Sequence, residues 1–168
     1  MPDLSTVRQN IIRQTFREVL PAKFDSTEAV VQLLAIGQQE SLFVHRTQVG
    51  GPAHGFWQFE RAGVRGVLEH KATRAYAIAA CAIRDCLPTV EAVYRRVVED
   101  DLLACSFARL NLWWDPKPLP APGQSEAAFS LYIRTWRPGA YDRGTSADRA
   151  KLRAKWERNY LAAMEALA

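Results

Sequence analysis

The apolar segment Ala29–Ile36 is the feature that most constrains what this chain can fold into. It contains one polar side chain, Gln32, and runs on towards Glu40. A helix that is apolar on most of its sides has to lie in the centre of a domain. The sequence therefore predicts a central helix, and Asp25 followed by Glu28 three residues later resembles a capping box at its start.

Helical periodicity recurs along the rest of the chain. Apolar residues at helical spacing predict a first helix over Leu4–Leu20, which Pro21 ends. Further helices are predicted over residues 61–70, 73–86, 89–98, 100–113, 125–136 and 146–167. Residues 44–60 are rich in glycine and have little helical period, which predicts an ordered loop or a small hairpin. No strand-rich region and no repeat is evident, so the expected fold class is mostly α.

The size of the chain predicts one domain over residues 1–168. A chain of 168 residues with 48% hydrophobic content can bury about two thirds of its unfolded surface in a single core. Residues 115–124 contain four prolines and are expected to form an extended surface connection. The segment 125–168 is too short for a separate domain, so its helices are expected to pack on the same core.

The composition gives no indication of a nucleic-acid partner, a metal site, a cofactor or a membrane-spanning segment. The net charge of +4 favours anionic surfaces, but the basic residues form no single run, so no specific nucleic-acid partner is predicted. Cys81, Cys86 and Cys105 make neither a disulfide framework nor a metal-binding spacing, so no metal and no cofactor are expected. The chain lacks a signal-peptide pattern and an apolar run of about 20 residues, which predicts synthesis in the cytoplasm and no membrane insertion.

Glu40 is the strongest candidate for a catalytic group. It stands at the C-terminal end of the apolar helix, where the helix dipole and burial both raise the pKa of a carboxyl group. A general acid that works near neutral pH needs such a pKa. The alternative is a solvated glutamate at a helix end, which is the ordinary position for this residue type.

Two short motifs carry a resemblance to a known family. Glu40-Ser41-Leu42-Phe43 resembles the Glu-Ser-x-Phe motif of soluble lytic transglycosylases and of the wider lysozyme-like superfamily. Gly55-Phe56-Trp57-Gln58 is similar to the Gly-Leu-Met-Gln motif of the same family, at the right separation. The resemblance covers residues 28–60 and extends weakly to Tyr132-Ile133. It implies a lysozyme-like helical domain.

The resemblance implies a role for each matching residue. Glu40 would be the catalytic acid and base, with Ser41 orienting it or touching the substrate. The substrate cleft would be lined by the second motif and closed by one tyrosine, namely Gly55, Phe56, Trp57, Gln58 and Tyr132. The family cleaves the β-1,4 bond between N-acetylmuramic acid and N-acetylglucosamine, and a lone glutamate closes a 1,6-anhydro ring.

The chain departs from the family pattern at two places. The third motif, of the type Ala-Tyr-Asn-Ala-Gly, is missing from the region 105–114, where Asn111 remains as a candidate substrate-binding residue. Glu60 adds a carboxylate two residues after Gln58. With two acids a hydrolase mechanism is also open, in which Glu40 is the acid and Glu60 activates water.

The resemblance implies peptidoglycan glycan strands as the partner and a phage origin. The enzyme would act at the bacterial cell wall, either as a virion component beside other virion proteins or as an endolysin. An alternative is a virion structural protein that keeps the lysozyme-like fold without activity. A third interpretation is a small helical protein that binds another macromolecule through Trp113, Trp114 and the proline-rich connection.

Overall fold

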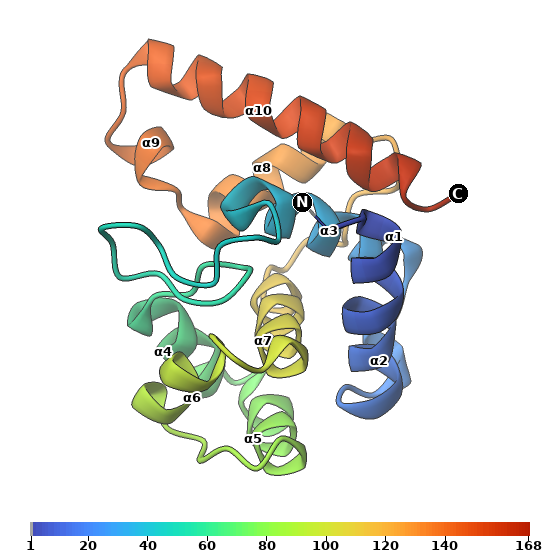
Figure 1. Ribbon diagram of the computed structural model, residues 1–168, viewed down its shortest axis with the longest axis vertical. Coiled ribbons are helices and arrows are strands. Elements are labelled where there is room, and N and C mark those ends of the chain that lie inside the picture. The colour runs from blue at the N-terminus through green and yellow to red at the C-terminus, as the bar shows by residue number, and fades with distance from the viewer. Residues whose placement is uncertain (1) are drawn as a thin grey trace.

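A computed structural model describes residues 2–168 of the chain (Figure 1). Helices make up 65% of it, which confirms the mostly-α fold class. Within residues 2–168, the strand-like pairing consists of two isolated antiparallel bridges, Thr47 with His54 and His54 with Phe59. The segment after the central helix is therefore an ordered loop without a regular hairpin.

The central helix, α3 (Thr27–Ser41), has the burial that its sequence predicts. Twelve of its fifteen residues are buried, so α3 presents almost no surface to solvent. Its cap lies one residue later than expected. The Ser26 hydroxyl accepts from the Ala29 amide at 3.1 Å, while the Asp25 carboxylate pairs with Arg13 at 2.5 Å. The prediction that Asp25 caps the helix was wrong, because the neighbouring serine satisfies the free amide.

The N-terminal segment forms one helical stretch before α3. It consists of α1 (Leu4–Val7), a π-helical turn (Arg8–Arg13) and α2 (Gln14–Glu18). A 3-10 turn (Ala22–Phe24) then places the fully buried Phe24 side chain just before α3.

The remaining helices agree with the predicted ranges to within a few residues. They are α4 (Arg61–Glu69), α5 (Arg74–Ile83), α6 (Val90–Arg96), α7 (Asp101–Trp113), α8 (Ser125–Trp136) and α10 (Ser146–Glu165), while α9 (Gly139–Asp142) lies between the last two. Thr89 caps α6, and its hydroxyl accepts from the Ala92 amide at 3.3 Å. Helix α5 ends earlier than predicted because Asp85 adopts φ 49° and the Cys86 amide turns back to the Cys81 carbonyl. The short helix α9 was not predicted.

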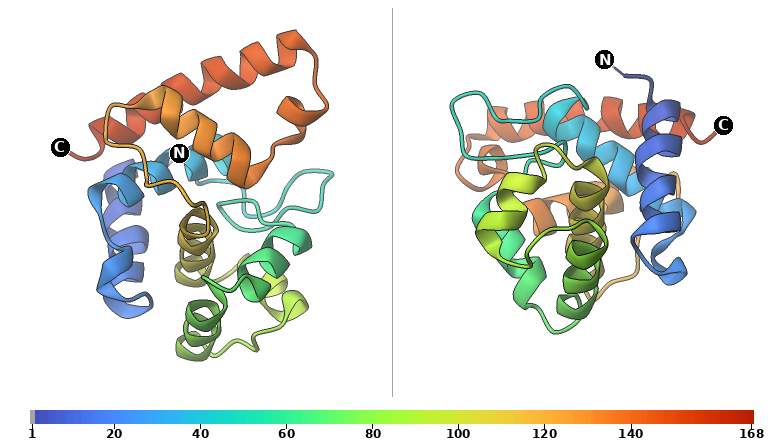
Figure 2. Two further views of the ribbon diagram at one scale, coloured as in Figure 1. Left: turned by 180° about the vertical axis from the view of Figure 1, so that it is seen from behind. Right: turned by 60° about the horizontal axis from the view of Figure 1, so that its bottom comes forward.

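The helices surround α3 and α7. Helix α10 crosses above α3, with α8 behind it, while α4, α5 and α6 lie below and α7 occupies the middle (Figures 1 and 2). Buried apolar residues from Leu4 to Ala163 form one cluster that includes members of the C-terminal helices. The segment between α7 and α8 is exposed or half-exposed over residues 116–124.

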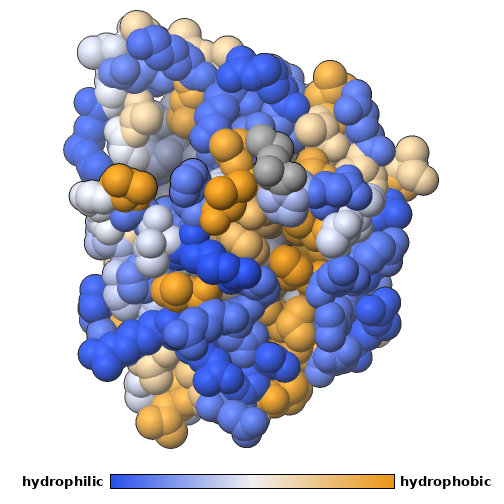
Figure 3. All heavy atoms as spheres, viewed as in Figure 1, coloured by the Kyte–Doolittle hydropathy of each residue, from blue (hydrophilic) through white to orange (hydrophobic). Residues whose placement is uncertain are grey.

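The outer surface is predominantly polar on the face shown in Figure 3, where apolar patches are separated by hydrophilic side chains. None of the helices within residues 2–168 is long and apolar enough to cross a lipid bilayer.

Candidate functional site

Glu40 lies in the last turn of α3, immediately before the chain leaves the helix. Its side chain is half-buried, and its carboxylate Oε1 accepts a hydrogen bond of 2.7 Å from the hydroxyl of Tyr132 on α8. Leu42 and Phe43 follow with φ of 55° and 52°, so the backbone turns sharply away directly after the acid. The carboxyl group therefore stands where a buried helix reaches the surface.

Tyr132 is held rigidly by α10. Its ring is 1% exposed and stacks on the fully buried Trp156 ring, with centroids 5.0 Å apart and 14° between the planes. Burial is the largest cause that raises the pKa of Tyr132, and the neighbouring Glu40 carboxylate adds to it. The hydroxyl consequently stays protonated and remains a donor to Glu40.

Helix α10 also fixes the end of α3 beside the acid. Lys155 donates from Nζ to the backbone carbonyl of Gln39, and Asn159 donates from Nδ2 to the Gln39 side-chain oxygen at 2.7 Å. The positive charge of Lys155 acts on the Glu40 carboxylate. Two side chains from a distant part of the sequence thus position the residue before Glu40 and bias its ionisation.

The pKa of Glu40 is raised from 4.5 to about 7. Removal of water from around the carboxyl group raises it, whereas the Tyr132 hydrogen bond and the charge of Lys155 lower it. The effect of desolvation is larger than the two opposing effects, although the residue keeps some exposure. A carboxyl with this pKa can both give and take a proton near neutral pH, as general acid–base catalysis requires.

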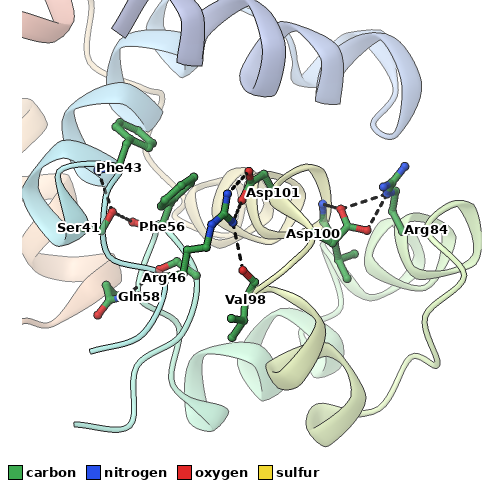
Figure 4. A network of polar contacts seen from close by, with 11 residues as sticks. Ser41, Phe43, Arg46, Phe56, Gln58, Arg84, Val98, Asp100 and Asp101 are labelled. Carbon is green, nitrogen blue, oxygen red and sulfur yellow. Dashed lines mark hydrogen bonds and ion pairs between the residues drawn. The ribbon is translucent and has the colours of Figure 1, made fainter. Parts of the chain in front are cut away.

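Ser41 connects the end of α3 to the following loop, residues 42–60. Its buried hydroxyl donates to the Phe56 carbonyl at 2.7 Å and accepts from the Phe43 amide at 3.1 Å (Figure 4). Because both of these partners are backbone groups, Ser41 positions the loop next to Glu40. Its hydroxyl is not presented to solvent.

The aromatic residues of the second motif pack inward. Trp57 is fully buried and donates from its indole to the Leu33 carbonyl at 2.9 Å, and its ring meets Phe43 edge to face. Phe56 is 7% exposed, and the Arg46 guanidinium lies 4.2 Å above its ring. Neither ring offers a free face for a sugar, so in this structure both act as packing between loop and helix.

Gly55 and Gln58 form a turn in the loop. Gly55 has φ +73°, and its amide donates to the Arg46 carbonyl at 2.7 Å. Gln58 has φ 51° and donates from its side chain to the Gly55 carbonyl at 2.8 Å. Its side-chain oxygen has no hydrogen-bond partner within the described residues. Gln58 is therefore the member of this motif whose side chain remains half-exposed with a free acceptor.

The loop is also tied to the lower helices. Arg46 forms a two-pronged ion pair with Asp101 at the start of α7, one prong being 2.8 Å, and donates to the Val98 carbonyl at 3.1 Å (Figure 4). From α8, the Trp136 indole donates to the Trp57 carbonyl at 2.8 Å. These contacts hold the loop between α7 and α8.

Asn111 and Glu60 make no hydrogen bond to Glu40 within residues 2–168. The buried Asn111 amide donates to the Thr135 carbonyl at 3.0 Å, and its oxygen accepts from the Trp114 indole at 3.1 Å. It joins α7 to α8. Glu60 is exposed and precedes the first residue of α4 without a side-chain capping bond.

Sequence reasoning missed the contribution of α10 to the surroundings of the acid. Periodicity predicted a helix over residues 146–167, but none of its residues was a candidate for the site. Lys155 and Asn159 instead contact Gln39, which is itself buried. No local pattern signals this contact, because Lys155 is indistinguishable in sequence from its exposed neighbours.

Comparison of the chain with protein-family models, with curated proteins and with solved structures finds no match. Within residues 2–168, no group of three or more His, Cys, Asp or Glu side chains is placed to hold a metal ion.

We expect Tyr132→Phe to raise the pKa of Glu40 further above 7. The variant keeps the buried ring but removes a hydrogen bond to the charged form of the carboxyl group. Lys155→Met should shift the pKa in the same direction, because it removes a neighbouring positive charge. The pKa can be followed from the carboxyl ¹³C shift of Glu40 by NMR. Tyr141→Phe on α9 is the control, and a pKa unchanged by both test substitutions would contradict the role of this network.

Proposed function

We propose that the chain is a peptidoglycan-cleaving enzyme with a lysozyme-like fold and that Glu40 is its general acid and base. The observation that carries the proposal is the half-buried Glu40 carboxyl at the end of the central helix, bonded to Tyr132 and with a pKa of about 7. Perturbed acids of this kind concentrate at functional sites. The Glu-Ser-x-Phe and Gly-Phe-Trp-Gln motifs favour the bond between N-acetylmuramic acid and N-acetylglucosamine as the target.

The proposed reaction uses the two protonation states of Glu40 in turn. The protonated carboxyl gives its proton to the glycosidic oxygen as the bond to the muramyl C1 breaks. The resulting carboxylate then takes a proton from the muramyl C6 hydroxyl, whose oxygen closes the 1,6-anhydro ring on C1. Tyr132 remains hydrogen-bonded to the carboxylate, and the charge of Lys155 stabilises it. The proton returns to Glu40, so the acid is ready for the next cycle.

The surrounding residues would support this reaction in different ways. Gln58, with a free amide oxygen in the loop, is the residue best placed by its exposure to bind the sugar. Ser41, Phe56 and Trp57 would act by holding the loop against α3. Glu60 belongs to the alternative hydrolytic route, in which a second carboxylate activates water. The site of action in this proposal is the bacterial cell wall, reached with a virion or after release from the cell.

A second candidate is a virion structural protein that has the same fold without activity. It is favoured by the engagement of Phe56, Trp57 and Asn111 in packing, which leaves few groups to recognise a sugar. A scaffold does not require a desolvated acid, however, and the raised pKa of Glu40 favours the enzyme.

Release of muropeptides from purified sacculi tests the proposal. We expect the parent chain to solubilise sacculi and Glu40→Gln to reduce the rate by at least about 100-fold, in line with the usual contribution of general acid catalysis. Glu69→Gln, at an exposed position in the last turn of α4, is the matched control and should retain full activity. Absence of activity in the parent would support the structural protein, and equal activity in Glu40→Gln would remove Glu40 from the mechanism.

The products and Glu60→Gln separate the two chemical routes. If Glu40 acts alone, mass spectrometry should find 1,6-anhydro ends, and Glu60→Gln should cleave at the parent rate. If Glu60 activates water, the products should have reducing ends, and Glu60→Gln should lose activity.

A further inference from the structure

A cavity of about 230 Å³ lies between the C-terminal end of α7 and the proline-rich segment that follows it. Its lining combines Arg109, Leu112 and Trp113 of α7 with Lys117 and Leu119 and the neighbouring prolines of the segment. Apolar and aromatic walls with a few polar groups are typical of a site for a small molecule.

Arg109 is a buried cation without a carboxylate partner within residues 2–168. The residue is 3% exposed, and its Nε donates to the Phe24 carbonyl at 2.9 Å. Its Nη1 is enclosed and has no hydrogen-bond acceptor. The guanidinium carbon lies 5.5 Å from the Phe24 ring centroid and 5.1 Å from that of Trp113, so aromatic rings are its nearest compensation. An unpaired buried charge is costly, and a bound anion would remove that cost.

Burial is the largest influence on the protonation of this group and lowers the pKa of Arg109 to about 10. The direction is the one expected of a desolvated cation. An arginine still carries its charge at neutral pH under these conditions.

The one carboxylate of the cavity lining is already neutralised by another residue. Asp115 accepts from the Arg134 guanidinium at 3.0 and 3.2 Å and from the Lys117 amide at 3.1 Å. Its charge is therefore compensated by α8. Lys117 contributes a second positive charge to the lining. The Trp113 indole N–H, in contrast to the other four indoles, has no acceptor within the described part of the chain.

We propose that this cavity binds a small molecule that carries one carboxylate on an apolar body. A carboxylate matches the uncompensated buried charge of Arg109 and the planar donor fork of its guanidinium. The apolar body would lie against Trp113, Leu119 and the prolines. A phosphate lacks an apolar body, so it cannot make these contacts.

The cavity is separate from the candidate catalytic site. Phe24, whose carbonyl accepts from Arg109, lies three residues before the start of α3, whereas Glu40 is in its last turn. Fifteen helical residues place these ends about 20 Å apart. The carboxylate site does not depend on the proposed peptidoglycan cleavage, and either one can be correct without the other.

Titration with sodium hexanoate tests the inference, with sodium chloride at equal ionic strength as the reference. We expect a saturable shift of the Trp113 indole ¹H–¹⁵N resonance and a rise in Tm of several degrees, since a ligand that binds the folded state stabilises it. Hexanamide, which has the same body without the charge, should bind at least tenfold more weakly, and so should inorganic phosphate. Arg109→Met should remove the hexanoate response, while Arg95→Met, at an exposed position on α6, should keep it.

Specific results would overturn the carboxylate site. The proposal is wrong if the parent shows no saturable binding of hexanoate, or if hexanamide binds as tightly as hexanoate. It is also wrong if phosphate binds more tightly than hexanoate, or if Arg109→Met responds to hexanoate as the parent does. If Arg109→Met does not fold, Lys117→Gln provides the second variant. It is exposed, and we expect it to weaken hexanoate binding severalfold without an effect on hexanamide. An equal effect on both ligands would contradict the proposal.

Discussion

Glu40→Gln should make the folded protein more stable than the parent at pH 8, whereas the two proteins should be nearly equally stable at pH 4. The pKa of Glu40 is about 7 in the folded protein and 4.5 without the influence of the fold. Between these values the folded state binds the proton more tightly than the unfolded state. Stability of the parent therefore falls as the pH rises above 4.5, and the loss is complete above 7.

The size of this loss follows from the pKa difference. Since each pKa unit corresponds to about 1.4 kcal/mol, ionisation of Glu40 costs about 3 kcal/mol above pH 7. Glutamine has the shape of the protonated acid and its oxygen can still accept from Tyr132, so it avoids that cost. The attraction between Lys155 and the carboxylate is already included in this cost, because it lowers the pKa of Glu40.

Urea denaturation at pH 4, 6 and 8 measures this effect. The difference in unfolding free energy between Glu40→Gln and the parent should increase steadily over that range. Glu69→Gln should follow the parent at each pH. If the pH profiles of Glu40→Gln and the parent run parallel, the carboxyl group of Glu40 is not desolvated in the folded protein.

Stability and activity together discriminate between the two candidate functions. An enzyme tolerates a destabilising acid because the raised pKa serves proton transfer. Suppose that Glu40→Gln is more stable than the parent but the parent does not cleave sacculi. The buried carboxyl group would then be present without a role in that reaction, as in the structural protein. The two measurements are independent, since unfolding by urea requires no substrate.

The spacing of apolar residues was sufficient to predict most of the helices. A helix that buries one or more of its faces has apolar residues at helical spacing, and this spacing can be recognised in the sequence. The helix ends were less predictable. Asp25 and Ser26 are adjacent residues that can both cap, and in the structure Ser26 caps the helix while Asp25 pairs with Arg13. Asp85 was not expected to adopt a left-handed conformation, so the end of α5 was placed too late.

The candidate site was predictable where it depended on position along one helix. Glu40 follows an apolar run, and this context alone suggests a raised pKa. Whether Trp57 faces a ligand or the core depends on how the loop folds back onto α3, which local sequence does not determine. The same holds for Lys155, which is more than one hundred residues away from Glu40 in the chain but contacts the adjacent residue.

Gly55→Ala should destabilise the protein by about 3 kcal/mol. A residue with a side chain costs about 1–2 kcal/mol in the left-handed region, and Gly55 has φ +73°. A β-carbon there would also lie 2.6 Å from the Val97 carbonyl oxygen, a backbone atom that cannot rotate away. Forcing the backbone to shift adds a further cost of about 1–3 kcal/mol.

Gly50→Ala is a matched control for the cost of the close approach to Val97. Gly50 has φ +70° in the same loop, but a β-carbon at this position meets nothing within 4 Å. It should therefore lose only the conformational term, about 1–2 kcal/mol. Urea denaturation at pH 7 gives both values, and equal losses would show that the approach of Gly55 to Val97 is not a constraint.

Displacement of the loop in Gly55→Ala should also disturb the end of α3. The reason is that the Ser41 hydroxyl is bonded to the carbonyl of Phe56, the residue after Gly55. We therefore expect Gly55→Ala, and not Gly50→Ala, to change the pKa of Glu40.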